Sequence, residues 1–230
     1  MLARRIVDNI STVIVGKTSV IEHALAARIA QGHILSEDVP GVGKTMLAKS
    51  LSTFVGCSFK RIQFTPDLLP SDVSGISVYD QRSGEFHFRP GPIMSEVVLA
   101  DEINRATPKT QPALLEAMEQ LQVTVYGVTH GLHHPFIVIA TQNLIEYEGT
   151  FSLPEAQLDR FLMRISLGYP DFTEELSIIQ QQEQQHPIDS LKAVTTPDEV
   201  AALQRAARSV YGDQLVREHI VSLVEATRRH

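Results

Sequence analysis

The chain has 230 residues, of which 43% are hydrophobic and 20% charged, a composition typical of a folded globular protein that can bury a real core. Its formal net charge of -7 excludes a surface that attracts nucleic acid throughout, although it leaves room for a local basic patch. The single cysteine, Cys57, excludes an intrachain disulfide scaffold, and the lack of any apolar run of signal-peptide or membrane length predicts a cytoplasmic location.

Apolar spacing predicts helices that alternate with strands over the first two thirds of the chain. In chain order, the pattern predicts a helix over 19–31, a strand over 33–36, a helix over 45–54, and strands over 59–64, 97–100 and 136–141. Strands that alternate with helices indicate an α/β fold with a mainly parallel sheet.

A further helix is expected after the strand at 97–100. Thr107 and Pro108 make a good start for it, as a cap followed by a first-turn proline. Its apolar face consists of Leu114, Leu115, Met118 and Leu121. Pro112 lies inside this pattern, where it can delay the true start of the helix.

Two segments are typical of β-hairpins rather than of the sheet core. Residues 76–88 contain two short strands around a polar turn at 80–84, and residues 122–131 alternate Val123 and Val125 before a turn at Tyr126-Gly127. The pattern leaves two interpretations open, because a hairpin can cover the sheet or can contact a partner.

The stretch EDVPGVGKTMLAKSLS, residues 37–52, predicts a phosphate-binding turn that leads into a helix. Its glycines allow backbone N–H groups to surround phosphate oxygens, and the helix adds its positive end. Lys44 would reach the β- and γ-phosphates, and the Thr45 hydroxyl would bind Mg²⁺. The binding residues expected here are Pro40, Gly41, Val42, Gly43, Lys44 and Thr45.

Asp38 is a departure from the usual pattern G-x-x-x-x-G-K-[ST], because it stands where the first glycine is expected. A carboxylate beside phosphates is tolerable only if it points away from them. We therefore expect the Asp38 side chain to face away from the site.

The stretch EVVLADEINR, residues 96–105, predicts the acidic half of the same site. Asp101, at the end of a buried strand, can hold the Mg²⁺ shell, and Glu102 can deprotonate an attacking water. Alone, such a pair more often lies in a solvated loop, but a phosphate loop about 55 residues earlier makes the pattern specific. The polar clusters at 38–45, 101–105 and 142–143 all follow strands, so they should meet at one edge of the sheet.

These motifs resemble those of the MoxR-type AAA+ ATPases. The resemblance is carried almost continuously from about residue 10 to residue 170, by stretches such as TPDLLPSDVSG, GEFHFRPGPI, VLADEINRATPKTQPALLEAMEQLQVTVYG and LPEAQLDRF. It implies a P-loop AAA+ core over 1–168, with a parallel five-stranded sheet between helices and inserted β-hairpins. It also implies that residues 169–230 begin an all-α lid, and that ATP and Mg²⁺ are bound.

The resemblance assigns roles to particular side chains. Lys44 and Thr45 match Walker A, and Asp101 and Glu102 match Walker B. The remaining matches are Val15 and Gly16 at the adenine, Asn143 as the sensor 1 residue that helps to place the hydrolytic water, and Arg160 as the arginine finger that acts on a neighbouring subunit.

The last 60 residues are expected to be helical. The stretch FTEELSIIQQQ has helical spacing, and Thr196-Pro197 is a second cap with a first-turn proline. The glutamine-rich stretch at 180–185 is interpreted as a solvated helix end. The sensor 2 arginine of the family is expected just beyond the end of the chain, which suggests a truncated fragment.

The resemblance further implies a hexameric, chaperone-like ring that matures client proteins or loads their cofactors, often with partners that carry a von Willebrand factor A domain. The alternative is a nucleic-acid-associated motor, because helicases share the broader clade. The acidic charge balance and the lack of runs that combine basic and aromatic residues favour the protein remodeller.

Overall fold

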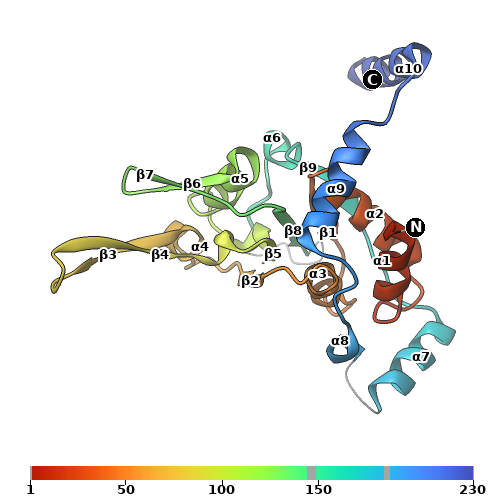
Figure 1. Cartoon of the computed structure of the whole chain (residues 1–230), viewed down its shortest axis with the longest axis horizontal. Coiled ribbons are helices and arrows are strands. Elements are labelled where there is room, and N and C mark those ends of the chain that lie inside the picture. The colour runs from red at the N-terminus through yellow and green to blue at the C-terminus, as the bar shows by residue number, and fades with distance from the viewer. Residues whose placement is uncertain (1, 144–148, 184–186, 230) are drawn as a thin grey trace.

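A five-stranded parallel sheet forms the centre of the protein, in the strand order β2-β5-β8-β1-β9 (Figure 1). The computed structural model describes residues 2–143, 149–183 and 187–229. The strands of the sheet are β1 (His33–Glu37), β2 (Phe59–Gln63), β5 (Val97–Asp101), β8 (Ile137–Gln142) and β9 (Phe161–Ile165). The prediction of an α/β fold with a parallel five-stranded sheet is confirmed.

Helices cover both faces of this sheet, so that its strands are buried on both sides. Along β8, Ile137 and Ile139 pack into one hydrophobic cluster, whereas Val138 and Ala140 pack into the other. The first cluster takes in α1 (Leu2–Ser11), α2 (Thr18–Ile29) and α3 (Lys44–Thr53), and the second takes in α4 (Pro70–Ser74) and α5 (Gln111–Gln120). Continuous apolar runs are what a parallel sheet between two helical layers requires.

The N-terminal helix and the start of α5 differ from the prediction. Helix α1 was not predicted, although it buries Ile6, Val7 and Ile10 in the first hydrophobic cluster, where it packs on α2 and α3. The expected start at Thr107-Pro108 is wrong, because Thr110 and Gln111 donate backbone hydrogen bonds to the Thr107 carbonyl in a turn and α5 begins only at Gln111. The delay caused by Pro112 is confirmed, since a proline in the first turn loses no helical hydrogen bond.

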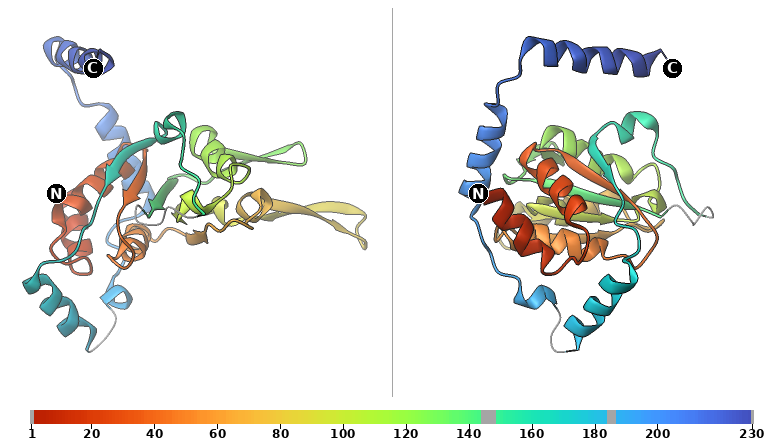
Figure 2. Two further views of the ribbon diagram at one scale, coloured as in Figure 1. Left: turned by 180° about the vertical axis from the view of Figure 1, so that it is seen from behind. Right: turned by 90° about the vertical axis from the view of Figure 1, so that its right-hand side faces the viewer.

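Both predicted hairpins are confirmed, and both project from the same side of the molecule (Figure 1; Figure 2, left). The longer pairs β3 (Gly75–Asp80) with β4 (Glu85–Pro90), and the shorter pairs β6 (Gln122–Val125) with β7 (Val128–Gly131). Phe88 of the first stacks on His130 of the second with ring centroids 3.8 Å apart. This contact ties the two hairpins together.

The described residues beyond β9 form helices, as expected: α7 (Phe172–Gln182), α8 (Pro187–Ser190), α9 (Pro197–Arg208) and α10 (Gln214–Arg228). A short helix, α6 (Glu155–Leu158), precedes β9. Thr196 caps α9 by accepting a hydrogen bond from the Glu199 N–H, which confirms the predicted start. Helix α10 stands away from the sheet (Figure 2, right). Over the described ranges, no helix combines the length and the apolar character needed to cross a bilayer.

His33 joins three elements of the core. Its Nε2 donates to the Met118 carbonyl at 3.1 Å, at the end of α5, and its Nδ1 accepts from the Val138 N–H at 3.0 Å, in β8. Burial lowers the pKa of His33, and the hydrogen bond to Met118 opposes only part of that effect. The imidazole is therefore held neutral in the folded protein.

We expect His33 to make the folded state sensitive to mild acid. The unfolded chain takes up a proton near the ordinary pKa of 6.5, whereas the folded imidazole does so only at lower pH. The contribution of His33 to the free energy of unfolding is thus complete above about pH 6.5. It falls as the pH drops below 6.5, by up to about 1.4 kcal/mol per pH unit. Urea titrations between pH 7.5 and 5 should show this slope, and His33→Gln should flatten it.

The matched control is His219→Gln on the exposed helix α10, which should keep the pH dependence of the wild type. If the free energy of unfolding falls with pH equally in His33→Gln and in the wild type, the neutral buried imidazole is not the cause of the acid sensitivity.

Candidate functional site

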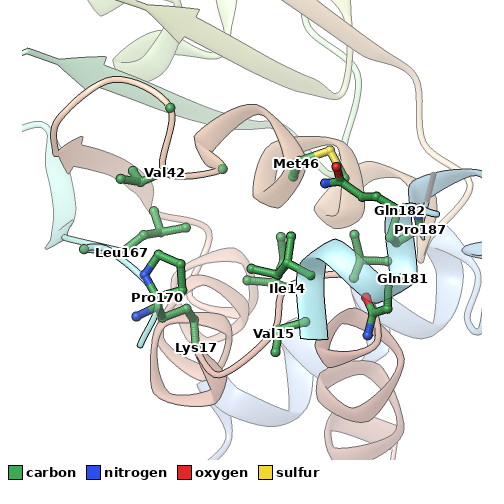
Figure 3. A pocket seen from close by; sticks show the side chains of 15 residues that line it. Ile14, Val15, Lys17, Val42, Met46, Leu167, Pro170, Gln181, Gln182 and Pro187 are labelled. Atoms are coloured by element: carbon green, nitrogen blue, oxygen red, sulfur yellow. The ribbon is translucent and has the colours of Figure 1, made fainter. Parts of the chain in front are cut away.

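Two adjoining cavities lie at the carboxyl edge of the sheet and share Gly41 and Gly43. One, of about 230 Å³, has mainly apolar walls (Figure 3). The other, of about 350 Å³, is lined by polar side chains and the glycine-rich turn: Pro40, Gly41, Gly43, Lys44, Thr45, Arg61, Asp101, Glu102 and Asn143. The three polar clusters that follow separate strands in the sequence therefore face one space.

The turn at 40–45 exposes backbone N–H groups because two glycines adopt the left-handed conformation. Gly41 has φ +87° and Gly43 has φ +94°, and glycine reaches this region without the steric cost that other residues meet. Helix α3 begins at Lys44, so its positive N-terminal end opens onto the polar cavity. The Lys44 ammonium donates to the Asp38 carbonyl at 3.1 Å.

The Asp38 carboxylate points away from the cavity, as expected. It accepts hydrogen bonds from the Ser36 hydroxyl at 3.1 Å, the Ser166 hydroxyl at 2.7 Å, and the N–H groups of Leu167 and Gly168 at 2.8 and 3.1 Å. Burial raises the pKa of this carboxyl, but the four hydrogen bonds outweigh burial and leave the pKa below its usual value. The charged side chain thus ties the start of the turn to the segment that follows β9.

Thr141 in β8 fixes the backbone and the side chain of the acidic pair. Its hydroxyl donates to Asp101 Oδ1 at 2.6 Å and accepts from the Glu102 N–H at 2.8 Å. The other oxygen of Asp101 accepts from Arg61 in β2, at 3.0 Å from Nε and 2.6 Å from Nη2. Asp101 is therefore held between the strands on either side of β5.

Glu102 adopts a left-handed backbone conformation, with φ +57°. Such a conformation is uncommon for a residue other than glycine and is often found at functional sites. Its carboxylate accepts a hydrogen bond from Gln63 at 2.9 Å and pairs with Arg105 at 3.3 Å. Asn143, which is 6% exposed, lines the same cavity, and its carbonyl accepts from Asn104 Nδ2 at 3.4 Å.

The apolar cavity lies between the segment that joins α1 to α2 and helix α7. Val15 and Lys17 line it, and Gly16 lies between them with φ +75°. A Cβ atom at Gly16 would overlap the Glu174 side chain as it is placed here, and the positive φ independently favours glycine, so Gly16 suits the close contact with α7. Lys17 pairs with Glu174 at 3.6 Å and strengthens the same contact.

Arg160 does not line either cavity. It lies between α6 and β9, where its Nη2 pairs with Glu119 Oε2 at 2.9 Å. A role for Arg160 at the site of a neighbouring subunit therefore stays a prediction.

Arg61 and Thr141 were not predicted as site residues. The strand register places Thr141 beside Asp101, because Ala100 pairs with Ala140 and the next residues along are Asp101 and Thr141, but this register is not readable from the sequence. The expectation of a solvated helix end is wrong for Gln181, which is half-buried and lines the apolar cavity. Residues 184–185 of that glutamine-rich stretch lie outside the described ranges.

The two cavities fit the two halves of a nucleoside triphosphate. Apolar walls suit a planar base, and the glycine-rich turn with Lys44 suits phosphates. The Thr45 hydroxyl and the Asp101 carboxylate supply the oxygen ligands that Mg²⁺ prefers.

Comparison with known proteins also points to an ATPase. Residues 33–163 match the family described as "ATPase family associated with various cellular activities (AAA)". Over 229 residues the chain is 55% identical to YeaC of Bacillus subtilis, and over 225 residues it is 41% identical to the chaperone MoxR1 of Mycobacterium tuberculosis. These alignments cover 100% and 98% of the chain, but 72% of YeaC and 59% of MoxR1.

A solved structure supports the relationship. A crystal structure described as that of "a putative ATPase from Cytophaga hutchinsonii" superposes with a TM-score of 0.90 at 39% identity, covering 98% of this chain and 68% of that one. The family match, the relatives and the parallel sheet with its glycine-rich turn show together that the chain belongs to the MoxR family of AAA+ ATPases.

Proposed function

We propose that the chain binds ATP and hydrolyses it to ADP and phosphate. The observation that carries this proposal is the junction of the apolar and polar cavities at Gly41 and Gly43. A ligand that fills both cavities must combine a flat apolar group with a strongly anionic one and pass the glycine-rich turn, as a nucleoside triphosphate does.

The phosphate-facing wall would act mainly through positive charge. Lys44 and the N-terminal end of α3 would bind the β- and γ-phosphates, and Arg61 adds a second cation on the same wall. Thr45 and Asp101 would hold Mg²⁺, which supplies charge compensation between these phosphates.

Glu102 is proposed as the general base, and Asn143 as the residue that positions the attacking water. Both line the polar cavity with Lys44. The Thr141 hydroxyl holds the Glu102 backbone, and Gln63 holds its carboxylate, so the geometry of the base depends on β2 and β8. A proton taken by Glu102 would leave hydroxide to attack the terminal phosphorus.

Replacing Glu102 by Gln keeps the size of the side chain and removes its ability to accept a proton. We expect Glu102→Gln to bind ATP like the wild type and to hydrolyse it roughly 10²- to 10⁴-fold more slowly. Calorimetry would measure binding, and phosphate release would measure turnover. Glu116→Gln, an exposed change on α5, is the control and should keep wild-type turnover. Near-normal hydrolysis by Glu102→Gln would remove Glu102 from the mechanism.

The active form is proposed to be a ring, in which each site is completed by Arg160 of a neighbouring subunit. A hexamer is the assembly that the MoxR resemblance implies. The position of Arg160 outside both cavities of its own chain supports a role in another subunit. A guanidinium placed at the developing charge is worth about 10³–10⁵ in rate in other phosphoryl-transfer enzymes.

A shared site predicts complementation between two inactive variants. Lys44→Ala should lose ATP binding and Arg160→Ala should lose hydrolysis, yet a mixture should regain part of the activity because some interfaces then combine an intact Lys44 with an intact Arg160. Phosphate release measured across mixing ratios would detect this. Arg205→Ala, an exposed change on α9, should be active without mixing. If the mixture assembles and stays inactive, the site is not shared.

The energy of hydrolysis is proposed to remodel client proteins in the cytoplasm, either maturing them or loading their cofactors. MoxR1, 41% identical to this chain, is a chaperone by name. Partners with a von Willebrand factor A domain are part of this proposal. No feature of the described residues favours the alternative of a motor on nucleic acid.

The two projecting hairpins are the proposed client-contacting surface. Their exposed apolar side chains include Tyr79, Phe86, Tyr126 and Val128, and Tyr126 is 83% exposed. Large exposed aromatics that project from the body are typical of protein contacts rather than of a structural cover. The Phe88–His130 stack would make the hairpins move together.

Removing the aromatic surface should separate hydrolysis from remodelling. We expect the double variant Tyr79→Ser, Phe86→Ser to keep ATP affinity and basal hydrolysis within a few-fold of the wild type. It should no longer suppress the aggregation of heat-denatured citrate synthase, which serves as a general chaperone probe. Tyr211→Ser, 80% exposed between α9 and α10, is the control and should keep both activities. Loss of hydrolysis in the double variant would show that the hairpin supports the ATP site.

A further inference from the structure

Arg61 saturates one oxygen of the Asp101 carboxylate. Its Nε and Nη2 atoms both donate to Oδ2, at 3.0 and 2.6 Å. A carboxylate oxygen accepts about two hydrogen bonds, so Arg61 uses both acceptor positions of Oδ2. The Thr141 hydroxyl takes one position of Oδ1. A metal ion that binds Asp101 would therefore meet the Arg61 guanidinium, either at Oδ2 or directly beside it.

The two members of this pair differ in how freely they can move. The Asp101 side chain is 13% exposed and is fixed at its other oxygen by β8. The Arg61 side chain is 49% exposed, belongs to the edge strand β2, and has Gln63 of the same strand as its other partner, at 2.6 Å. An arginine that is half exposed leaves a carboxylate at a small cost in free energy, because water replaces the lost contacts. Arg61 is thus the member of the pair that can change partner.

The charges that line the polar cavity are balanced because Arg61 is one of them. Two cations, Lys44 and Arg61, face the two carboxylates of Asp101 and Glu102. A divalent cation that enters alone finds no net negative charge there, whereas one that enters with a triphosphate brings its own anion. Phosphate oxygens also suit the planar fork of a guanidinium, which can donate two parallel hydrogen bonds to them.

We propose that Arg61 is a displaceable counter-cation of Asp101, which makes the site take a divalent cation together with a polyphosphate rather than alone. Arg61 neutralises Asp101 until an anionic ligand draws the guanidinium to itself, and Oδ2 is then open to the metal. This inference rests on the proposed binding of a nucleoside triphosphate and adds the order in which the charges of the site assemble. Arg61 acts here as a positioning residue and has no part in proton transfer.

The test measures two affinities of the chain separately. Electron paramagnetic resonance follows the binding of Mn²⁺ without nucleotide, and displacement of a fluorescent ATP analogue follows the binding of ATP in the presence of EDTA. Arg61→Gln should strengthen Mn²⁺ binding about 3- to 10-fold, because Asp101 loses its competing cation. The same change should weaken metal-free ATP by a similar factor, because the phosphate-facing wall loses a positive charge. A purely structural defect would weaken both, so the opposite signs identify the proposed role.

Two further variants locate the effect at the pair. Lys60→Gln removes the same charge from the neighbouring residue of β2, which is exposed and does not line the polar cavity, and it should change both affinities less than about two-fold. Asp101→Asn removes the carboxylate for which Arg61 and the metal compete. In that background Arg61→Gln should no longer strengthen Mn²⁺ binding.

Unchanged or weaker Mn²⁺ binding by Arg61→Gln would overturn the inference, as would a metal-free ATP affinity that does not fall. A gain in Mn²⁺ binding that persists in the Asp101→Asn background would also overturn it, because the ion would then be bound elsewhere. A wild type that binds no ATP, with or without Mg²⁺, would overturn the proposed function itself. The Mn²⁺ measurement needs no nucleotide, so the two failures are distinguishable.

Discussion

The buried Asp38 carboxylate is the constraint on which the geometry of the site depends. It stands at the junction of β1 with the glycine-rich turn and accepts hydrogen bonds from both sides, from Ser36 and from residues 166–168 after β9. The same residue accepts from Lys44 through its backbone carbonyl. One side chain therefore fixes where the phosphate-facing turn begins and where the chain leaves the sheet toward α7. Because the carboxylate is charged and buried, losing its partners would be costly, which keeps the turn and the α7 segment in register.

Parallel pairing explains why residues far apart in the sequence share one cavity. All five strands end at the same edge, so the residues after β1, β5 and β8 become neighbours whatever their separation along the chain. Thr141 is an example, because its hydroxyl in β8 hydrogen-bonds both the side chain of Asp101 and the backbone of Glu102, which follow the adjacent strand β5. A mutation in the sheet that shifts β8 against β5 would thus disturb the acidic pair directly, without touching either carboxylate.

The site joins two parts of the molecule with different surroundings. Its phosphate half is built on the rigid sheet, whereas its base half is closed by α7, which meets the core through Gly16, Lys17 and Glu174. The hairpins project from another side and contact each other through Phe88 and His130 (Figure 1). A nucleotide that contacts both the sheet and α7 would link the position of α7 relative to the sheet to the hydrolysis state of that nucleotide. This link is the physical basis on which hydrolysis can do mechanical work.

The amino-acid sequence by itself determined the α/β class, four of the five strands of the sheet to within a residue or two, both hairpins, the glycine-rich turn and the acidic pair at the end of β5, whereas the pattern did not predict β9. These follow from local periodicity, from turn chemistry and from side chains that lie next to one another in the chain. Only the tertiary structure decided the partners that come from other strands, such as Arg61 and Thr141 on Asp101, because cross-strand contacts depend on strand order and register. It also decided that Gln181 lines a cavity, since helical spacing alone leaves open which face of α7 meets the core.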